Sequence, residues 1–376
     1  MSYNLNDREI ILDLIKEDGY SLVYASELLK GDKELVLKAV KKNGLALKFA
    51  SDILKNDYNV VMEAVKENGE SLFFVSDNLK NNENIIIAAI NSYNNAFFKI
   101  PEKFKNDKNF ILKVIKNNGL LLKYLKNFNN DKKIVMEAVK NNGMTLINAS
   151  DAMKEDKDIV LEAVKNNGLA LQYSSRFLRK NEEIVIEAIK QYSYSLIYAS
   201  DELKRDKNFI KKALKFTGTL YKYLPYDLKL DSEIVLEAVK KNGYVLCFTP
   251  EQFQNEKNIV LEAVKQYPSS LLYASDNLKN DKDIVTAAVK VNGDSLHYAS
   301  NELKNDKKFM LNLIKNNGLL LQYVSDDLKN DKEVVFEAVN QNGLALQYSS
   351  LDLRKDSKIT SVAIKKNKLA EQFVIS

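Results

Sequence analysis

The stretch "DKDIVLEAVKNNGLALQYSS" at residues 156–175 recurs as "DKEVVFEAVNQNGLALQYSS" at residues 331–350. Fifteen of the twenty positions are identical, although the two copies start 175 residues apart. Self-similarity at a fixed spacing is the sequence signature of a repeat architecture. The extent of the repeat therefore decides how the rest of the chain is interpreted.

The same unit covers nearly all of the 376 residues. Counting its leading Asp as position 1, successive units start 25 residues apart, except that the unit at 107–130 has 24 residues. We therefore predict that residues 1–376 form a single continuous repeat array of fifteen units, the last incomplete. The units start at residues 7, 32, 57, 82, 107, 131, 156, 181, 206, 231, 256, 281, 306, 331 and 356.

The first half of each unit has the pattern of an amphipathic helix. Apolar residues occupy positions 4, 5, 8 and 9, as in Ile159, Val160, Ala163 and Val164, and this spacing places them on one helical face. The leading Asp is placed to cap the first N–H groups. Position 8 is Ala in twelve of fifteen units, which should let a neighbouring backbone approach closely.

Eleven of the twelve glycines occupy position 13, usually after Asn. After a helical segment, this pair predicts a helix end with Gly in the left-handed conformation, whereas a type I′ hairpin turn is the less favoured alternative. Asn94 at the same position fits, because Asn also tolerates positive φ. Pro268 does not fit, so its unit is expected to turn differently.

The second half of each unit is also predicted to be helical. Leu at position 16, a small residue at 19 and Leu or Phe at 23 follow a helical course, although positions 14, 16 and 18 also alternate like a strand. Pro101, Pro225 and Pro250 stand at position 20, where most units have Ser, and both residue types belong at a helix start. We predict a short helix over positions 14–19 and a further helical or 3-10 turn over positions 20–24.

A single unit cannot fold alone. Ordering 25 residues costs on the order of 38 kcal/mol, which requires burial of roughly 1,500 Å² of apolar surface. Each unit must therefore be covered by a neighbour on both sides. The predicted fold class is all-α, an α-solenoid of about fifteen tandem 25-residue helical repeats that forms an elongated superhelix.

The recurrent core N-G-x-A-L-x-[YF]-A-S, in units such as 281–305 and 331–355, resembles the repeat family named domain of unknown function 4116. The family's repeat spans about two of these units. The resemblance implies a helical repeat fold and no known activity. It assigns no catalytic or binding residue, because its pattern consists of structural positions.

Composition and rare residues limit the possible functions. The chain is 45% apolar and 28% charged, with no apolar run near the roughly 18 residues that a membrane helix needs and no visible secretory signal. We therefore expect a cytoplasmic protein without a membrane partner. Cys247 and His297 are the only Cys and His, which argues against a disulfide and a Cys/His zinc site, and we expect neither metal nor cofactor.

Catalytic motifs are not visible in the sequence. A Gly-rich phosphate loop, an HExxH pair and a nucleophile elbow are all missing, so we expect a protein that is not an enzyme. His297 stands at a variable position and is interpreted as an ordinary surface residue. Cys247 has no basic neighbour in sequence, so nothing indicates an activated thiol.

Positions 14 and 17 vary among units, so they are predicted to face outward and to contact a partner. Phe73 and Phe98 would form an exposed apolar patch, with half-burial under a neighbouring loop as the alternative. The stretches 82–130 and 206–270 depart most from the repeat, which can mark function, bends or drift. The predicted partner-binding residues are Phe73, Phe98, Tyr194, Tyr226, Tyr244 and Tyr267.

Two recurrent features leave a choice between structure and binding. The aromatic residue at position 18 is interpreted as a core ring whose hydroxyl bonds to backbone, with base stacking as the alternative. The Lys at position 10 should stabilise its helix end, often beside Glu at position 7. A polyanion-binding row is the alternative: Lys41, Lys66, Lys116, Lys140, Lys165, Lys190, Lys240, Lys265, Lys290 and Lys315.

These features predict a non-enzymatic repeat scaffold whose extended surface binds another protein. The identity of that protein is unknown from the sequence. The alternative function is binding of nucleic acid or another polyanion through the lysine rows.

Overall fold

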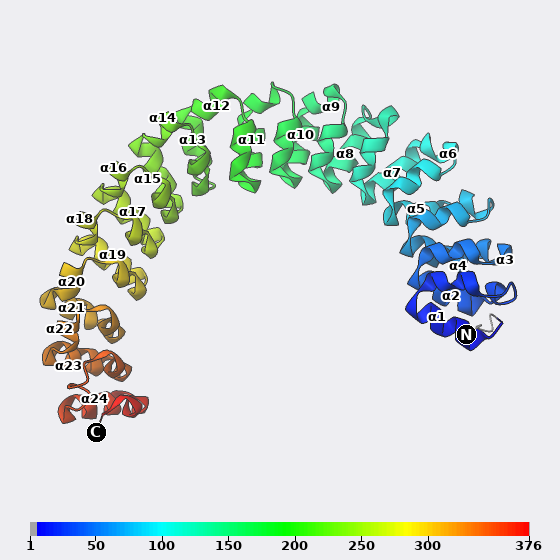
Figure 1. Ribbon diagram of the computed structural model, residues 1–376. Coiled ribbons are helices and arrows are strands. Elements are labelled where there is room, and N and C mark those ends of the chain that lie inside the picture. Colours follow the sequence, from blue (N-terminus) through cyan, green and yellow to red (C-terminus); the bar gives the residue numbers. More distant parts are fainter. Residues whose placement is uncertain (1–5, 376) are drawn as a thin grey trace. The chain divides into compact units, whose positions relative to one another are not determined.

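The computed structural model describes residues 6–375, and all regular structure in this range is helical. The chain divides into two compact units of similar size, and within each unit the helices follow one another in chain order (Figure 1). The first contains the described residues up to Leu178, and the second those from Arg179 onward. The boundary falls in the 3-10 turn η11 (Leu178–Lys180). Each compact unit is a stack of the 25-residue repeats, as an α-solenoid requires.

Each repeat of the first compact unit contributes a long α-helix, a six-residue 3-10 helix and usually a short final helical turn. The long helices are α1 (Arg8–Glu17), α2 (Lys33–Lys42), α4 (Tyr58–Glu67), α5 (Glu83–Ser92), α7 (Lys108–Asn117), α8 (Lys132–Asn141) and α10 (Lys157–Asn166). The 3-10 helices are η1 (Gly19–Tyr24), η3 (Gly44–Phe49), η4 (Gly69–Phe74), η6 (Asn94–Lys99), η7 (Gly119–Tyr124), η9 (Gly143–Asn148) and η10 (Gly168–Tyr173). The short turns are η2 (Leu29–Gly31), α3 (Asp52–Lys55), η5 (Leu79–Asn81), α6 (Glu102–Lys105), η8 (Lys126–Phe128) and α9 (Asp151–Glu155).

The second compact unit repeats this order. Its long helices are α11 (Glu182–Gln191), α13 (Lys207–Leu214), α15 (Ser232–Lys241), α17 (Lys257–Gln266), α19 (Lys282–Val291), α21 (Lys307–Ile314), α23 (Lys332–Gln341) and α24 (Ser357–Lys366). The 3-10 helices are η12 (Ser193–Tyr198), η13 (Gly218–Tyr223), η14 (Gly243–Phe248), η15 (Pro268–Tyr273), η16 (Gly293–Tyr298), η17 (Gly318–Tyr323), η18 (Gly343–Tyr348) and η19 (Lys368–Phe373). The short helices are α12 (Asp201–Arg205), α14 (Tyr226–Lys229), α16 (Glu251–Gln254), α18 (Asp276–Lys279), α20 (Asn301–Asn305) and α22 (Asp326–Lys329).

The predicted core positions are buried. In α10, Ile159, Val160, Ala163 and Val164 are fully inaccessible, and the same four positions are buried in most long helices. The short helix predicted over positions 14–19 is present, but it is a 3-10 helix and it spans positions 13–18. The predicted final turn is also confirmed, as a short α-helix or a 3-10 turn.

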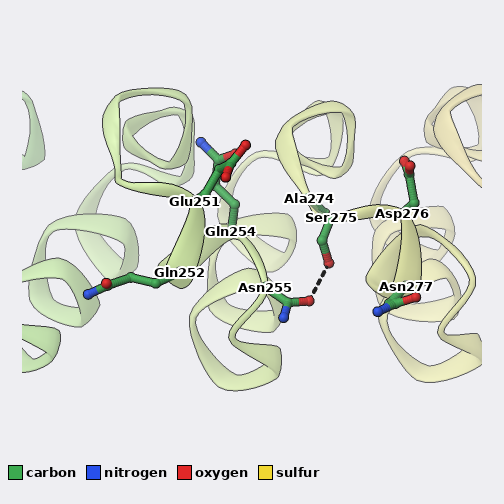
Figure 2. A pocket seen from close by; sticks show the side chains of 8 residues that line it. All are labelled: Glu251, Gln252, Gln254, Asn255, Ala274, Ser275, Asp276 and Asn277. Atoms are coloured by element: carbon green, nitrogen blue, oxygen red, sulfur yellow. Dashed lines mark hydrogen bonds between the residues drawn. The ribbon is translucent and has the colours of Figure 1, made fainter.

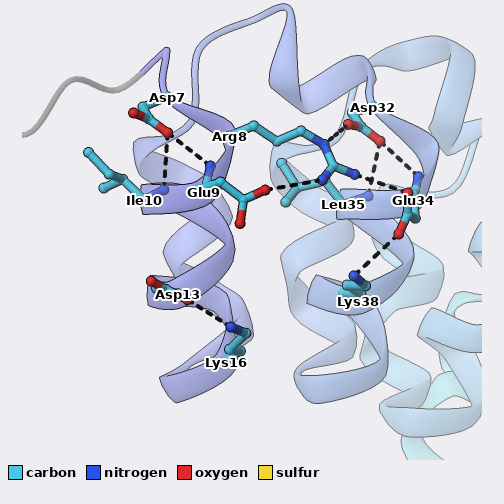
Figure 3. Close-up of polar contacts among 10 residues, drawn as sticks. All are labelled: Asp7, Arg8, Glu9, Ile10, Asp13, Lys16, Asp32, Glu34, Leu35 and Lys38. Atoms are coloured by element: carbon cyan, nitrogen blue, oxygen red, sulfur yellow. Dashed lines mark hydrogen bonds and ion pairs between the residues drawn. The ribbon is translucent and has the colours of Figure 1, made fainter.

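The leading Asp caps its helix and also joins it to the preceding repeat. Figure 3 shows the first case, in which Asp7 Oδ1 accepts from the N–H groups of Glu9 (2.9 Å) and Ile10 (3.3 Å). Arg8 Nε donates to Asp32 Oδ2 of the next repeat at 2.7 Å. Position 2 of one repeat therefore pairs with position 1 of the next.

This pairing recurs in every repeat that has Lys or Arg at position 2 and is followed by a repeat with Asp at position 1. The pairs are Arg8–Asp32, Lys33–Asp57, Lys108–Asp131, Lys132–Asp156, Lys207–Asp231, Lys257–Asp281, Lys282–Asp306, Lys307–Asp331 and Lys332–Asp356. At Asp57, partial burial opposes the charged form, but the hydrogen bond and charge of Lys33 and two backbone N–H groups outweigh it and lower the pKa.

The prediction of left-handed glycines is wrong. Among residues 6–375, neither a Gly nor any other residue has positive φ. A Cβ added to Gly243 would lie 2.1 Å from the carbonyl oxygen of Ala263, at position 8 of the next repeat. Glycine therefore stands at position 13 because the neighbouring helix leaves no room for a side chain, and the prediction that Ala at position 8 permits close approach is confirmed.

The residue before the glycine ends the α-helix and also begins the 3-10 helix, so the predicted helix end is confirmed. The N–H of Asn43 donates to the carbonyl of Ala39 at 2.9 Å. Asn43 is extended, and its Oδ1 accepts from the N–H of Leu45 at 3.1 Å, as in an N-cap. Asn94 is the first residue of η6 without positive φ, so its predicted left-handed role is also wrong. Pro268 is the first residue of η15, where proline is well tolerated, so its repeat does not turn differently.

Position 20 carries a second link between repeats. The N–H of Ser325 donates to the carbonyl of Lys304 at 3.0 Å, and its Oγ donates to Asn305 Oδ1 at 2.6 Å. Pro101, Pro225 and Pro250 begin short helices at this position, as predicted. Because proline has no N–H, these three repeats lack the backbone link.

Candidate functional site

The residues predicted to contact a partner are exposed. Positions 14 and 17 belong to the 3-10 helices, and most of their side chains reach the surface, which confirms the outward orientation. The exposed fractions range from 41% to 73% for the six predicted residues, Phe73, Phe98, Tyr194, Tyr226, Tyr244 and Tyr267.

The aromatic residues at position 18 share this surface. Their interpretation as core rings is wrong, because each is half-buried or, at Tyr24 and Phe248, exposed. Their hydroxyls also bond to side chains, since Tyr124 donates to Asn95 Oδ1 at 3.2 Å and Tyr323 to Asp294 Oδ1 at 2.8 Å. Burial together with this hydrogen bond raises the pKa of Tyr323 to about 12.

Aromatic rings of consecutive repeats pack against each other in the second compact unit. Tyr194 contacts Tyr223 edge to face with ring centroids 5.4 Å apart. Tyr244 contacts three rings, at 5.7 to 6.0 Å. We call this surface the tyrosine strip and define it by Tyr194, Tyr223, Tyr244, Phe248, Tyr267 and Tyr273. It contains three of the six predicted residues and brings Tyr244 and Tyr267 together.

The three other predicted residues lie elsewhere. Phe98 packs edge to face on Tyr124 with centroids 4.8 Å apart, whereas Phe73 lies beneath Lys99, whose Nζ is 4.9 Å from the ring centroid. The two phenylalanines thus occupy neighbouring repeats, and Phe98 contacts another ring whereas Phe73 contacts an ammonium group. Tyr226 is the first residue of the short helix α14, outside the 3-10 helices that carry the tyrosine strip.

A hollow forms at the same place in two irregular repeats. Phe98 and Tyr124 line one of about 380 Å³ in the first compact unit. Ile197 and Tyr223, at the equivalent positions 17 and 18, line one of about 270 Å³ in the second, together with Leu224 and Pro225. Each hollow could receive an apolar side chain of a partner.

A larger groove of about 610 Å³ lies between the short helices α16 and α18 (Figure 2). Its lining is polar, and Ser275 Oγ donates to Asn255 Oδ1 at 2.7 Å across it. Glu251 and Asp276 contribute carboxylates at its rim. The Ser–Asn bond recurs between other short helices, as from Ser325 Oγ to Asn305 Oδ1 at 2.6 Å, so it belongs to the repeat and does not mark a special site.

The ten lysines of the alternative function are all exposed, but many are neutralised. Six of them lie within 4.0 Å of a glutamate, as Lys265 does at 2.7 Å from Glu262. The predicted pairing of positions 7 and 10 is therefore confirmed. The row offers a weaker field to a polyanion than its sequence suggests.

His297 and Cys247 both occupy position 17, in the 3-10 helices η16 and η14. His297 is exposed, with its ring 5.3 Å from Tyr298, as expected of a surface residue. Burial raises the pKa of the Cys247 thiol, which disfavours a reactive thiolate. Residues 6–375 contain no cluster of three His, Cys, Asp or Glu suited to a metal ion. No helix in that range has the length and apolarity to cross a membrane.

Sequence reasoning missed two groups of surface residues. Leu28 and Ile53, both at position 22, are 85% and 83% exposed. The only sequence signal for them was that position 22 is apolar in some units and polar in others. Lys215, Lys222 and Lys241 have no carboxylate within ion-pair distance among residues 6–375. For Lys215 the signal was present, because position 7 of its repeat is Lys212 rather than Glu.

Comparisons with known proteins agree with this architecture. No curated protein matches the chain. The family described as Domain of unknown function (DUF4116) matches it in nine segments, at residues 7–55, 32–80, 57–105, 82–128, 107–154, 156–204, 206–254, 256–304 and 306–354, of which the first five overlap. Each segment spans two of the repeats described above, and together they cover most of the chain. The protein therefore belongs to the DUF4116 family of tandem helical repeats.

Proposed function

We propose that this protein is a non-enzymatic scaffold of the cytoplasm that binds another protein along the surface of its 3-10 helices. One observation carries the proposal: exposed aromatic side chains gather in the repeats that depart from the common pattern. Residues 192–273 contain seven exposed Tyr and Phe side chains, whereas residues 281–350 contain none. Stacking of the repeats does not require these rings, since the regular repeats stack without them.

The chemistry of the surface suits a protein partner. Tyrosine combines a large apolar ring with a hydrogen-bonding hydroxyl, and it is enriched where proteins bind one another. The hollow beside Ile197 offers a place for an apolar anchor. The paired lysines of position 10 give the surface mixed charge rather than the continuous positive stripe that nucleic acid favours.

Affinity capture from the source cell with the full chain tests the proposal. We expect a specific polypeptide to be retained by the wild type and lost with Tyr194→Ser/Tyr244→Ser/Tyr267→Ser or with Phe73→Ser/Phe98→Ser. Leu28→Ser/Ile53→Ser removes apolar groups at position 22 that are even more exposed, and it should leave capture intact. The captured protein is then purified and titrated directly against the same variants.

Other outcomes would contradict the proposal. Capture that survives both aromatic variants and fails with Leu28→Ser/Ile53→Ser would place the binding surface on the short helices. Retention of nucleic acid, with an affinity that falls steeply with salt, would favour the lysine rows instead.

A further inference from the structure

We propose that the tyrosine strip binds an extended acidic segment of the partner, with apolar or proline side chains against the rings and carboxylates on Lys215, Lys222 and Lys241. This inference rests on the proposed function and specifies its partner. It follows from the packing of the rings, from the charges around them and from the spacing of the repeats.

The rings form a row of two clusters across four repeats, and Lys222 lies between the clusters. Position 14 of one repeat meets position 18 of the next, as Tyr194 meets Tyr223 and Tyr244 meets Tyr273. Between these pairs, Lys222 Nζ lies 5.6 Å from the centroid of Phe248. The exposed ring surfaces therefore follow one another along the stack, as a long and narrow ligand requires.

The charges beside the row are positive. Positions 10–18 of the four repeats from residue 181 to residue 280 contain six lysines and no Asp or Glu. Three of these lysines pair with glutamates at position 7 of their own helices, as Lys265 does with Glu262. Lys215, Lys222 and Lys241 remain without a carboxylate partner among the described residues. Carboxylates of a partner would complement these three cations.

Two acids of the neighbouring short helices pair with cations of the short helices themselves. Asp201 lies 2.7 Å from Lys204, and Asp227 lies 3.0 Å from Arg205. Glu251 and Asp276 line the separate groove between α16 and α18. The positive charge of the strip therefore comes from Lys215, Lys222 and Lys241, because glutamates of their own helices pair with the other three lysines.

The spacing of the repeats favours an extended peptide. Packed helices lie about 8–10 Å apart, and a polyproline II chain advances about 9.3 Å in three residues. Every third residue of such a peptide can therefore meet the equivalent position of the next repeat. Aromatic-lined grooves commonly bind this conformation, and the hollow beside Ile197 can take one of its apolar side chains.

Single-stranded nucleic acid suits the strip less well. Bases stack on free ring faces, whereas Tyr244 is surrounded by three rings in edge-to-face contact. A nucleic acid would also present a charge at every residue to only three unpaired lysines. We therefore treat it as a competing outcome of the test.

Fluorescence anisotropy with the full chain and a labelled peptide of four Asp-Pro-Leu triplets tests the inference. In polyproline II form this peptide spans about 37 Å, enough to cross four repeats. We expect saturable binding that weakens with salt. A peptide of Lys-Pro-Leu triplets and one of Asp-Gly-Ser triplets should bind at least about tenfold more weakly, because one lacks the charge and the other lacks the apolar groups.

Charge reversal locates the site. Lys215→Glu/Lys222→Glu/Lys241→Glu should weaken binding of the acidic peptide by about tenfold or more. The matched control reverses Lys290, Lys315 and Lys365, three exposed lysines of the row at position 10 outside the strip, and should change binding less than about twofold. Circular dichroism checks that both variants keep their helices.

Three results would overturn the inference: no binding of the acidic peptide, equal loss in both charge-reversed variants, or tighter strip-dependent binding of a twelve-nucleotide oligothymidine. Neither of the first two results would refute the proposed function, which would still stand if capture of a polypeptide from the cell depended on the aromatic residues. Conversely, if the acidic peptide bound but no polypeptide were captured in this way, the proposed function would be contradicted and the binding chemistry of the tyrosine strip would stand.

Discussion

Residues 181–280 and 281–355 belong to the same compact unit and are built from the same repeat, yet they differ in the polar links between neighbouring repeats. In the second region, Lys282, Lys307 and Lys332 pair with the capping Asp of the following repeat without interruption. In the first, Glu182 and Ser232 occupy that position and break the ladder. The regular region therefore has more polar links between repeats.

The backbone links differ in the same way. Ser300, Ser325 and Ser350 each donate an N–H to the preceding repeat, whereas Pro225 and Pro250 cannot. The irregular region instead exposes aromatic rings. It therefore has fewer links between repeats and an aromatic surface that stacking does not need.

The close contact at position 13 is common to both regions and should cause the largest loss of stability when disturbed. Gly243→Ala places a Cβ 2.1 Å from the carbonyl oxygen of Ala263, so two helices must move apart. We expect the free energy of unfolding to fall by about 2–3 kcal/mol, measured by urea denaturation.

Gly293→Ala is the matched control in the regular region. Its new Cβ would meet the ends of the Leu320 and Asn317 side chains, at 3.0 and 3.1 Å, because position 8 of the next repeat is Leu313 rather than Ala. These flexible groups can rotate, so the loss should stay below about 1 kcal/mol. Equal losses at Gly243 and Gly293 would contradict the steric explanation.

Transferring the irregular region's proline to the regular region should have the next largest effect. Ser325 has φ of −61°, which suits proline, so Ser325→Pro removes hydrogen bonds without backbone strain. It loses the N–H bond to Lys304 and the Oγ bond to Asn305, for about 1–2 kcal/mol. Hydrogen exchange should show weaker protection around residues 304–328.

Ser325→Ala separates the two contributions. It keeps the N–H bond to Lys304 and loses only the bonds of the hydroxyl, so it should cost less than Ser325→Pro. If the two variants lose the same stability, the backbone link does not hold the repeats together.

The ion pairs of the regular ladder predict a smaller effect that depends on pH. At Asp331, partial burial opposes the charge, but the bond from Lys307 at 2.9 Å and two backbone N–H groups lower the pKa. Its stabilisation is thus complete above the unfolded pKa of about 3.9 and disappears as the pH falls through the folded value.

Asp331→Asn keeps the cap on Glu333 and Val334 but removes the ion pair. It should cost about 0.5–1 kcal/mol at neutral pH and progressively less below about pH 4. Urea midpoints at several pH values measure the difference. A constant difference across this range would show that the ion pair does not contribute.

The sequence was sufficient to predict the repeat, its boundaries, the buried face of each long helix and the helical nature of the second half. These features depend on local patterns, such as apolar spacing and the capping Asp. The left-handed glycine could not be corrected from the sequence, because the need for glycine at Gly243 comes from Ala263 in the next repeat. A contact of that kind becomes visible only when the helices are placed together.

The candidate site was predicted in part for the same reason. Variable positions correctly indicated that Tyr194 and Tyr244 are exposed, and the irregular stretch 206–270 correctly indicated Tyr267. The rings at position 18, such as Tyr223 and Phe248, were assigned to the core because constant aromatic residues usually pack inside. In the structure they are constant because they contact the preceding repeat, and they are half-exposed because the 3-10 helices lie at the surface.

The smallest predicted effect is a repair of the irregular region. Glu256 occupies the capping position of α17 but makes no side-chain hydrogen bond to the helix, because its longer side chain places the carboxylate beyond the first N–H groups. Glu256→Asp should restore the cap and stabilise the protein by about 0.5 kcal/mol, since Asp is among the preferred N-caps. Thermal denaturation should show a small rise in Tm, while Glu251→Asp, the same change within the first turn of α16, should have no effect. An unchanged Tm with Glu256→Asp would mean that capping does not limit the stability of this repeat, and that its weakness relative to residues 281–355 lies in the links between repeats.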